Sequence, residues 1–340
     1  DLHSFPTRRS SDLGNWAPSA IREADYVLIE STYGDRLHKD DAATREEFRS
    51  VILTALKDRG KVLIPSFVVD RAQRLLFELS LMQIEGLLPE IPIFFDSPMG
   101  VRATELYRTY GDTLSGEVRR HAAAGVDLFS PKGFRSVSTP EESQKINDVP
   151  FGIVIAGSGM CTGGRIVHHL KHGAWNPRNH IVFVGYQAYG TLGRRIVDGE
   201  TELRIAGEDV IVKAQVHTIG GFSAHGDRDD LLAWAGHYTT NPLFFVTHGE
   251  PKASQAFSAA LRERGMRGIV PALGQEFSIE PGASAATMEA EAKPAAAART
   301  PQAEIPGVLD DIERLLERLR RDEGALADSE ENYQDRTSVV

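Results

Sequence analysis

Short apolar runs that alternate with amphipathic helical patterns are the feature that most restricts the fold of this chain. The runs are rich in β-branched and aromatic residues, which predicts buried strands. This strand-then-helix order predicts an α/β fold with a parallel sheet flanked by helices. The expected strands lie within residues 24–30, 61–67, 91–98, 151–160, 180–187 and 243–249, and the expected helices within 41–60, 71–83, 100–110, 164–173, 228–238 and 251–265.

Composition limits the class of protein. The chain has 340 residues and is 41% apolar, which is enough for one large core or two domains. No apolar run approaches about 18 residues, so we expect no membrane-spanning segment, and we find no signal peptide. The single cysteine, Cys161, excludes an internal disulfide and favours a cytoplasmic location. A net charge of −10 argues against nucleic-acid binding through bulk charge, but it is compatible with a local basic groove.

Both ends of the chain differ in character from its middle. Residues 1–13, "DLHSFPTRRSSDL", have neither helical nor strand periodicity and resemble translated sequencing-adapter read-through. We expect an artefactual or disordered segment there. The Ala-, Glu- and Pro-rich residues 281–304 predict a disordered linker. An apolar stripe in residues 305–325 predicts an amphipathic helix, and residues 326–340 are expected to form a disordered tail.

A glycine-rich segment, "GSGMCTGG" at 157–164, lies between an expected strand and an expected helix. This context is typical of a phosphate held by backbone N–H groups, and also of a dinucleotide fingerprint. A dinucleotide site needs an acidic residue near the end of the next strand. Residues 165–197 contain neither Asp nor Glu, which argues against an NAD-dependent oxidoreductase. A phosphate contact from Ser158 and its neighbours, and a plain tight turn, both stay open.

One helix carries two histidines at a spacing that can chelate a metal. His168 and His172 are four residues apart on one expected helix face, but no carboxylate lies nearby in the sequence. Surface or packing roles are therefore favoured for this pair. The remaining isolated histidines to which we assign no role are His38, His121, His180 and His237.

Two other histidines follow expected strands. His225 closes "GFSAH" and His248 closes "FFVTH", each after an expected buried strand, and Glu30 ends a third strand. His225 taken alone is typical of a helix N-terminus. Side chains at the carboxyl ends of strands in open α/β sheets line the ligand crevice. The three placements together therefore predict a site that combines an acid, a base and a metal ligand.

Seven sequence blocks occur in a characteristic order. They are "VLIESTYGDRLH" (27–38), "IPSFVVDRAQ" (64–73), "FFDSPM" (94–99), "AGSGMCTGGRIVHHL" (156–170), "VGYQAYGTLGRRI" (184–196), "GFSAHGD" (221–227) and "VTHGEP" (246–251). Together they resemble the β-CASP branch of the metallo-β-lactamase superfamily, whose members are zinc-dependent nucleases. The resemblance covers about residues 14–280.

The resemblance implies the C-terminal part of an αββα metallo-β-lactamase fold with an inserted β-CASP α/β cap domain. Residues 14–40 would be a remnant of the metallo-β-lactamase domain. Residues 41–210 would form the cap domain, and residues 211–280 the C-terminal return of the metallo-β-lactamase domain.

The resemblance also implies roles for individual residues in the cleavage of RNA phosphodiester bonds. Glu30 would orient His225, which would act as a general acid, because a neighbouring carboxylate favours a protonated imidazole. His248 would bind one of two zinc ions. The residues placed along the path of a single-stranded RNA substrate are Ser158, Gly159 and Thr191. A homodimer is compatible with the resemblance.

One departure from the family pattern concerns the metal site. The family's main zinc motif, His-x-His-x-Asp-His, does not occur among the eleven histidines of the chain. We therefore expect the chain by itself to be inactive. Asp12 stands where the family has a bridging metal ligand, but it also belongs to the adapter-like segment, and both origins stay open.

Two alternatives to a ribonuclease stay open from the sequence. One is a ligase-associated β-CASP DNA exonuclease, because the motifs contact a phosphodiester backbone in either case. The other is a non-catalytic RNA-binding scaffold subunit, which would not need the Glu30–His225 pair. Endonuclease and exonuclease action are not separated by these motifs, and neither are RNA and DNA preference.

Overall fold

The computed structural model describes residues 2–4 and 21–277 of the chain. The chain divides into two compact units, Asp1–Val270 and Pro271–Val340, and all the elements discussed here belong to the first. The predictions made for Asp12 and for residues 281–304, 305–325 and 326–340 fall outside the described residues.

The larger of two main sheets has six strands, and every pairing within it is parallel. This arrangement confirms the parallel sheet expected from the alternating strand and helix patterns. In spatial order its strands are β10 (Gln215–Thr218), β7 (His180–Phe183), β3 (Lys61–Pro65), β6 (Gly152–Ala156), β4 (Ile93–Asp96) and β5 (Phe134–Val137).

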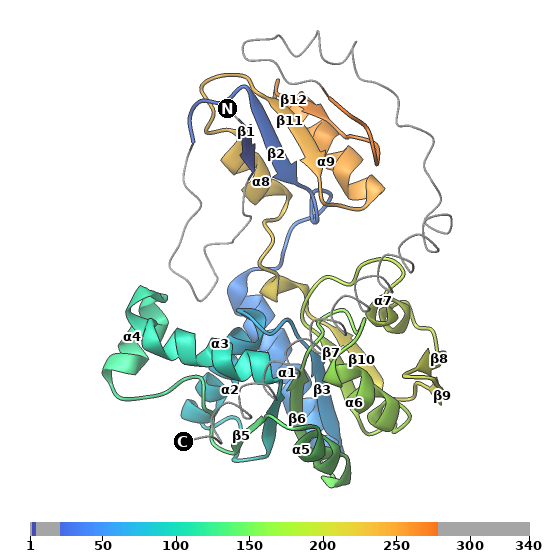
Figure 1. Cartoon of the computed structure of the whole chain (residues 1–340). Coiled ribbons are helices and arrows are strands. Elements are labelled where there is room, and N and C mark those ends of the chain that lie inside the picture. The colour runs from blue at the N-terminus through green and yellow to red at the C-terminus, as the bar shows by residue number, and fades with distance from the viewer. Residues whose placement is uncertain (1, 5–20, 278–340) are drawn as a thin grey trace, which may run out of the picture. The chain divides into compact units, whose positions relative to one another are not determined.

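Helices cover both faces of this sheet (Figure 1). Side chains alternate along each strand, so Ile64 belongs to the core with Phe48 of α1 and Leu75 of α2, while Leu63 belongs to the opposite core with Ile166 of α6. Apolar residues on both faces explain the nearly continuous apolar strand sequences. The helices are α1 (Asp41–Asp58), α2 (Arg71–Ile84), α3 (Pro98–Thr109), α4 (Gly116–Ala123), α5 (Pro140–Lys145), α6 (Arg165–Gly173) and α7 (Leu192–Val197), with short 3-10 turns at Gly111–Thr113 and Ile146–Asp148.

The smaller sheet is also parallel and carries two of the expected site residues. Its order is β1 (Leu2–Ser4), β2 (Tyr26–Glu30), β11 (Leu243–Thr247) and β12 (Arg267–Ile269). Two helices, α8 (Arg228–Ala235) and α9 (Pro251–Glu263), share an apolar core with it (Figure 1). The register places Glu30 opposite Thr247, so the last residue of β2 lies beside the end of β11.

Three findings differ from the sequence-based expectations. Leu2–Ser4 form a strand that pairs with β2, whereas we expected no regular structure in residues 1–13. β10 pairs with β7, so the larger sheet continues beyond residue 210, where we placed the end of the inserted domain. The short hairpin β8 (Glu202–Ile205) and β9 (Glu208–Ile211) was not predicted, because its strands are largely exposed and have no continuous apolar run. Leu203 and Val210 of the hairpin pack against the α6 core.

None of the helices in the described part of the chain is long and apolar enough to cross a membrane.

Phe257 of α9 packs in the apolar core of the smaller sheet, and its substitution tests this packing. Its side chain is fully buried, and a Cβ atom at Gly34 would lie 2.6 Å from its own Cβ. We expect Phe257→Ala to lower the free energy of unfolding by about 3–5 kcal/mol, because it leaves a cavity in a close-packed core. Urea denaturation followed by circular dichroism measures this change. Leu273→Ala is the control, since Leu273 is 91% exposed, and a loss of under about 1 kcal/mol for Phe257→Ala would contradict the packing described.

Candidate active site

Glu30 is a buried carboxylate at the end of β2, and its side chain is 6% exposed. Its Oε2 atom accepts a hydrogen bond of 2.6 Å from the hydroxyl of Thr32. The same Oε2 atom lies 2.6 Å from Nδ1 of His225 and 3.8 Å from Nδ1 of His248. A buried carboxylate is costly unless hydrogen bonds or opposite charge compensate it. The side chains around Glu30 provide this compensation.

His225 reaches Glu30 from the connection between β10 and α8. Its backbone N–H donates to Oγ of Ser223, and Nε2 of His38 lies 3.1 Å from its carbonyl oxygen. The expectation that His225 follows a buried strand of the same kind as β2 and β11 is wrong. β10 is largely exposed and belongs to the larger sheet, and the 3-10 turn Gly220–Phe222 separates it from His225. The contact with Glu30 therefore joins segments of two different sheets.

His248 follows β11 directly and lies next to Thr32. Its Nδ1 atom is 3.2 Å from Oγ1 of Thr32, and its backbone has a left-handed conformation with a φ of 47°. Gly249 comes so close to Ser31 that a Cβ atom there would lie 2.4 Å from Oγ of Ser31. The side chain of His248 is 70% exposed. Because Nδ1 faces Thr32 and Glu30, Nε2 is the nitrogen that remains for a ligand.

The three expected residues thus come together in the structure. One ligand atom from each of Glu30, His225 and His248 can be chosen so that all lie within 4.8 Å of one another. Zinc in proteins usually takes four ligands, or three with a water at a catalytic site. Oε2 of Glu30 is in contact with Thr32 and His225, whereas the side chain of His248 is largely exposed and can take a ligand at Nε2. The described residues thus supply three potential ligands, of which Glu30 and His225 are also in contact with each other.

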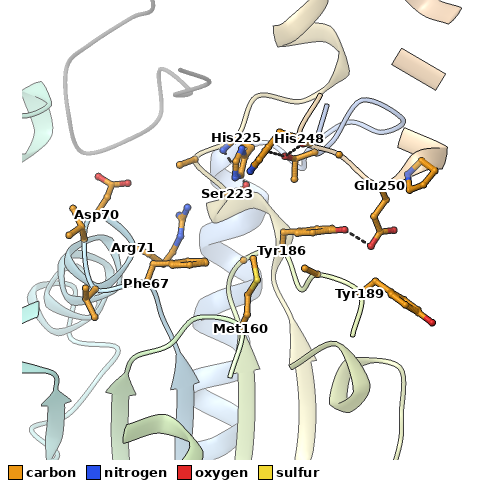
Figure 2. Close-up of a pocket in the computed structure, with 18 residues that line it drawn as sticks. Phe67, Asp70, Arg71, Met160, Tyr186, Tyr189, Ser223, His225, His248 and Glu250 are labelled. Carbon is orange, nitrogen blue, oxygen red and sulfur yellow. Dashed lines mark hydrogen bonds between the residues drawn. The ribbon is translucent and has the colours of Figure 1, made fainter. Parts of the chain in front are cut away.

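A pocket of about 990 Å³ opens beside these residues. His225, His248 and Ser223 lie on one side of it, and Phe67, Met160 and Tyr186 lie on the opposite side (Figure 2). The first group is polar and comes from loops that follow β10 and β11. The second presents aromatic rings and a thioether from loops that follow β3, β6 and β7. Further lining residues are Thr32, Val68, Val69, Asp70, Arg71, Gly185, Ala188, Tyr189, Ala224, Gly249, Glu250 and Pro251.

Tyr186 connects the two sides of the pocket through a hydrogen bond. Its hydroxyl donates to Oε1 of Glu250, the residue before α9, and Nη1 of Arg194 lies 3.4 Å from the same oxygen. Burial raises the pKa of Tyr186, and the nearby Glu250 carboxylate raises it further. The phenol therefore keeps its proton at neutral pH and can act as a donor to the carboxylate.

The residues expected along an RNA path have local structural contacts. Oγ of Ser158 accepts from the backbone N–H of Thr162, and the hydroxyl of Thr191 caps α7 by accepting from the N–H of Arg194. Gly159 is buried and its carbonyl accepts from Gln187. As far as the described residues show, Ser158, Gly159 and Thr191 do not line the large pocket. Their expected contacts with RNA stay predictions.

Two polar clusters in the structure, each built around a buried histidine, were not predicted from the sequence. His168 and His172 line a second pocket of about 350 Å³, but it is the buried His169 between them that contacts a carboxylate, with Nε2 2.7 Å from Oδ2 of Asp96. His180, which was given no role, is fully buried and has its Nδ1 atom 2.9 Å from Nε2 of His217. No signal in the sequence separates these buried histidines from exposed ones.

His38 was also given no role, although it supports the site. Besides its contact with the carbonyl of His225, its ring lies against Tyr33 with a centroid distance of 4.4 Å. Its backbone N–H donates to Oδ2 of Asp227 over 3.0 Å. Its position inside the block "VLIESTYGDRLH", which begins with the strand that bears Glu30, was the available signal.

Comparison with known proteins supplies the family. Residues 72–196 match the Beta-Casp domain, and residues 209–271 match the Zn-dependent metallo-hydrolase RNA specificity domain. The chain belongs to the β-CASP family. The mixed α/β architecture with parallel sheets accordingly fits a metallo-β-lactamase fold with a β-CASP cap.

Two named proteins are similar to this chain over most of its length. The chain is 42% identical to Ribonuclease TTHA0252 of Thermus thermophilus over 79% of its own length and 63% of that protein. It is 36% identical to Transcription termination factor FttA of Thermococcus kodakarensis over 78% of its own length and 41% of that protein. The chain therefore spans about two fifths to under two thirds of the length of these relatives.

Asp227 joins the loop of His225 to the segment after β2. It caps α8 by accepting from the backbone N–H groups of Asp229 and Asp230, and it also accepts from His38. Burial acts to raise the pKa of Asp227, but these backbone donors outweigh it and hold the pKa below its ordinary value of 3.8. A depressed pKa means that the folded state favours the charged form. Its contribution to stability is thus present above the ordinary value and is lost as the pH falls through the folded-state pKa.

We expect Asp227→Asn to lower the free energy of unfolding at pH 7 by about 0.5–1 kcal/mol, because it removes a charge at a helix N-terminus. The difference from the wild-type chain should shrink as the pH falls below the ordinary value of 3.8 and should vanish below the lower folded-state pKa, where Asp227 is protonated in both states. Urea denaturation at a series of pH values measures both effects. Asp209→Asn is the control, because Asp209 lies in the strand β9, away from any helix N-terminus, and pairs with the exposed Arg204. A difference that stays constant with pH would contradict the role of the Asp227 charge.

Proposed function

We propose that the whole protein is a metal-dependent hydrolase that cleaves phosphodiester bonds of single-stranded RNA, with His225 as the proton donor to the leaving 3′-oxygen. The observation that carries this proposal is the 2.6 Å contact between Nδ1 of His225 and Oε2 of the buried Glu30, at the edge of the large pocket. A carboxylate on one ring nitrogen fixes the orientation and the tautomer of the imidazole. The other nitrogen, Nε2, is then the one that can transfer a proton to a substrate.

RNA is favoured over DNA by the comparisons. The domain at residues 209–271 is described by its RNA specificity, and one relative is named a ribonuclease. Neither domain description and neither relative named above refers to DNA cleavage. A non-catalytic scaffold is disfavoured for a different reason, because RNA binding alone does not need a buried carboxylate that orients an imidazole. The Glu30–His225 pair supports a catalytic role.

Zinc is the metal implied by the family description, and we propose that the whole protein holds two zinc ions. His248 would supply one ligand through Nε2, since its Nδ1 atom faces Thr32. When zinc is bound, it acts as a Lewis acid that activates water and offsets the negative charge of a phosphate. We assign Glu30 and His225 to proton transfer and place them outside the ligand set, and the contact between Nδ1 of His225 and Oε2 of Glu30 supports this assignment.

We also propose a cytoplasmic location. The single cysteine, Cys161, is a buried free thiol, and burial raises its pKa to about 12, so it stays protonated and unreactive. A chain without a disulfide suits a reducing compartment. Homodimerisation stays a prediction from the sequence.

Substitutions of the two histidines should separate the donor from the metal ligand. In the zinc-loaded whole protein, we expect His225→Ala to slow the cleavage of single-stranded RNA by about 10²–10⁴-fold, which is the usual effect of losing a general acid. Its zinc content should not change. His248→Ala should lower both the zinc content and the cleavage rate. Metal analysis and single-turnover cleavage of a labelled oligonucleotide measure the two quantities.

His121→Ala is a suitable control, because His121 lies in α4 and is not among the residues that line the large pocket. Loss of zinc from the His225 variant would assign that residue to the metal site and contradict its role as a donor. A slowing of only a few-fold would return His225 to the role of a loop residue next to the start of α8.

A further inference from the structure

Phe67 is a large apolar side chain that remains half exposed inside the proposed catalytic pocket. It follows β3, whose last residues are buried, yet 47% of its own surface is accessible. Burying a phenylalanine is favourable by roughly 1.5–3 kcal/mol, so an exposed ring in a concave site indicates a ligand surface. Figure 2 shows the ring on the side of the pocket opposite His225 and His248.

The ring is held in place from behind. A Cβ atom at Gly159 would lie 2.7 Å from Cδ2 and 2.9 Å from Cε2 of Phe67, so only a glycine leaves room for the ring there. The carbonyl oxygen of Phe67 accepts hydrogen bonds from the hydroxyl of Ser66 and the backbone N–H of Ala72. One side of Phe67 is thus packed against the glycine-rich loop, and its free surface faces the pocket. A fixed aromatic ring of this kind costs little further entropy when it binds a ligand.

The pocket has different chemistry on its two sides. Met160 and Tyr186 extend the apolar surface of Phe67, whereas His225 and His248 present imidazoles from the other side (Figure 2). A ligand that fits both needs a flat apolar face close to a negatively charged group. A nucleotide of single-stranded RNA has this composition, with a base to stack and a phosphate to meet the imidazoles. A base inside a duplex cannot offer its face in this way.

We propose that Phe67 is the stacking platform for the nucleobase next to the scissile phosphate, an assignment that rests on the function proposed above. Stacking on a phenyl ring holds a base without reading its hydrogen-bonding edge. The site would therefore grip one unpaired base of any identity and thereby position the adjoining phosphate near His225. Gly159 contributes to this by leaving space for the ring.

Binding measurements with the chain itself test the proposal. The probes are a fluorescein-labelled uridine octanucleotide and the same ribose-phosphate backbone without bases, followed by fluorescence anisotropy at one fixed salt concentration. We expect Phe67→Leu to weaken binding of the octanucleotide by about 5- to 100-fold, which corresponds to the loss of one stacked base. Phe67→Tyr should bind almost as the wild-type chain does. The loss for Phe67→Leu should disappear with the base-free backbone, because no base is present to stack.

Two further variants complete the comparison. Tyr110→Ala removes an aromatic ring that is 58% exposed but is not among the residues lining the pocket, and it should bind both probes normally. Gly159→Ala should weaken binding of the octanucleotide but not of the base-free backbone, because its methyl group displaces the ring of Phe67. A loss on both probes would instead show that Gly159 contacts the phosphate.

The outcomes separate this proposal from the proposed function. Normal binding of the octanucleotide by Phe67→Leu would overturn the stacking role alone, and so would an equal loss on both probes. If the wild-type chain binds neither probe, RNA recognition by these residues fails, and both proposals fail with it. Free energies of unfolding measured for each variant show whether a loss of binding follows from a damaged fold.

Discussion

The buried carboxylate of Glu30 is the group on which the arrangement of the site depends. A carboxylate that is almost fully excluded from water is stable only if nearby groups compensate its charge. Thr32, His225 and His248 each place one side-chain atom within 4 Å of its Oε2 atom. Thr32 follows Glu30 by two residues in the chain. The parallel register of β2 and β11 brings His248 beside Glu30, and His225 reaches it from the loop that follows β10 of the other sheet.

The second constraint is the way in which loops from the larger sheet reach the same pocket. Pro65 at the end of β3 pairs with Ala156 at the end of β6, so the loops that bear Phe67 and Met160 begin side by side. Parallel strands place all such loops at one edge of a sheet. The pocket thus receives polar groups from one set of loops and apolar groups from another. This division follows from the topology and does not require any single strand to carry both kinds of residue.

Much of this arrangement could be predicted from the sequence, and the remainder had physical reasons to be missed. The larger strands and helices were predictable because their apolar residues repeat with a clear period. Glu30 and His248 were predictable because Glu30 ends such a strand and His248 directly follows one. The environment of His225 was not predictable, since β10 is exposed and its pairing with β7 depends on residues far away in the sequence. His38 and His169 make contacts between elements that are far apart in the sequence, and a single sequence contains no periodic signal for such contacts.

The glycine-rich segment shows how one pattern can have two physical causes. The sequence "GSGMCTGG" is compatible with a phosphate loop, because glycines before a helix expose backbone N–H groups, and also with a plain tight turn. In the structure the N–H of Ser158 donates to the carbonyl of Gly163, and Gly159 lies where a Cβ atom would collide with Phe67. Close approach of a ring thus accounts for Gly159 without any anion. If that ring binds a base, the segment still contributes to RNA recognition, but it does so by supporting an aromatic surface and leaves the phosphate to the histidines across the pocket.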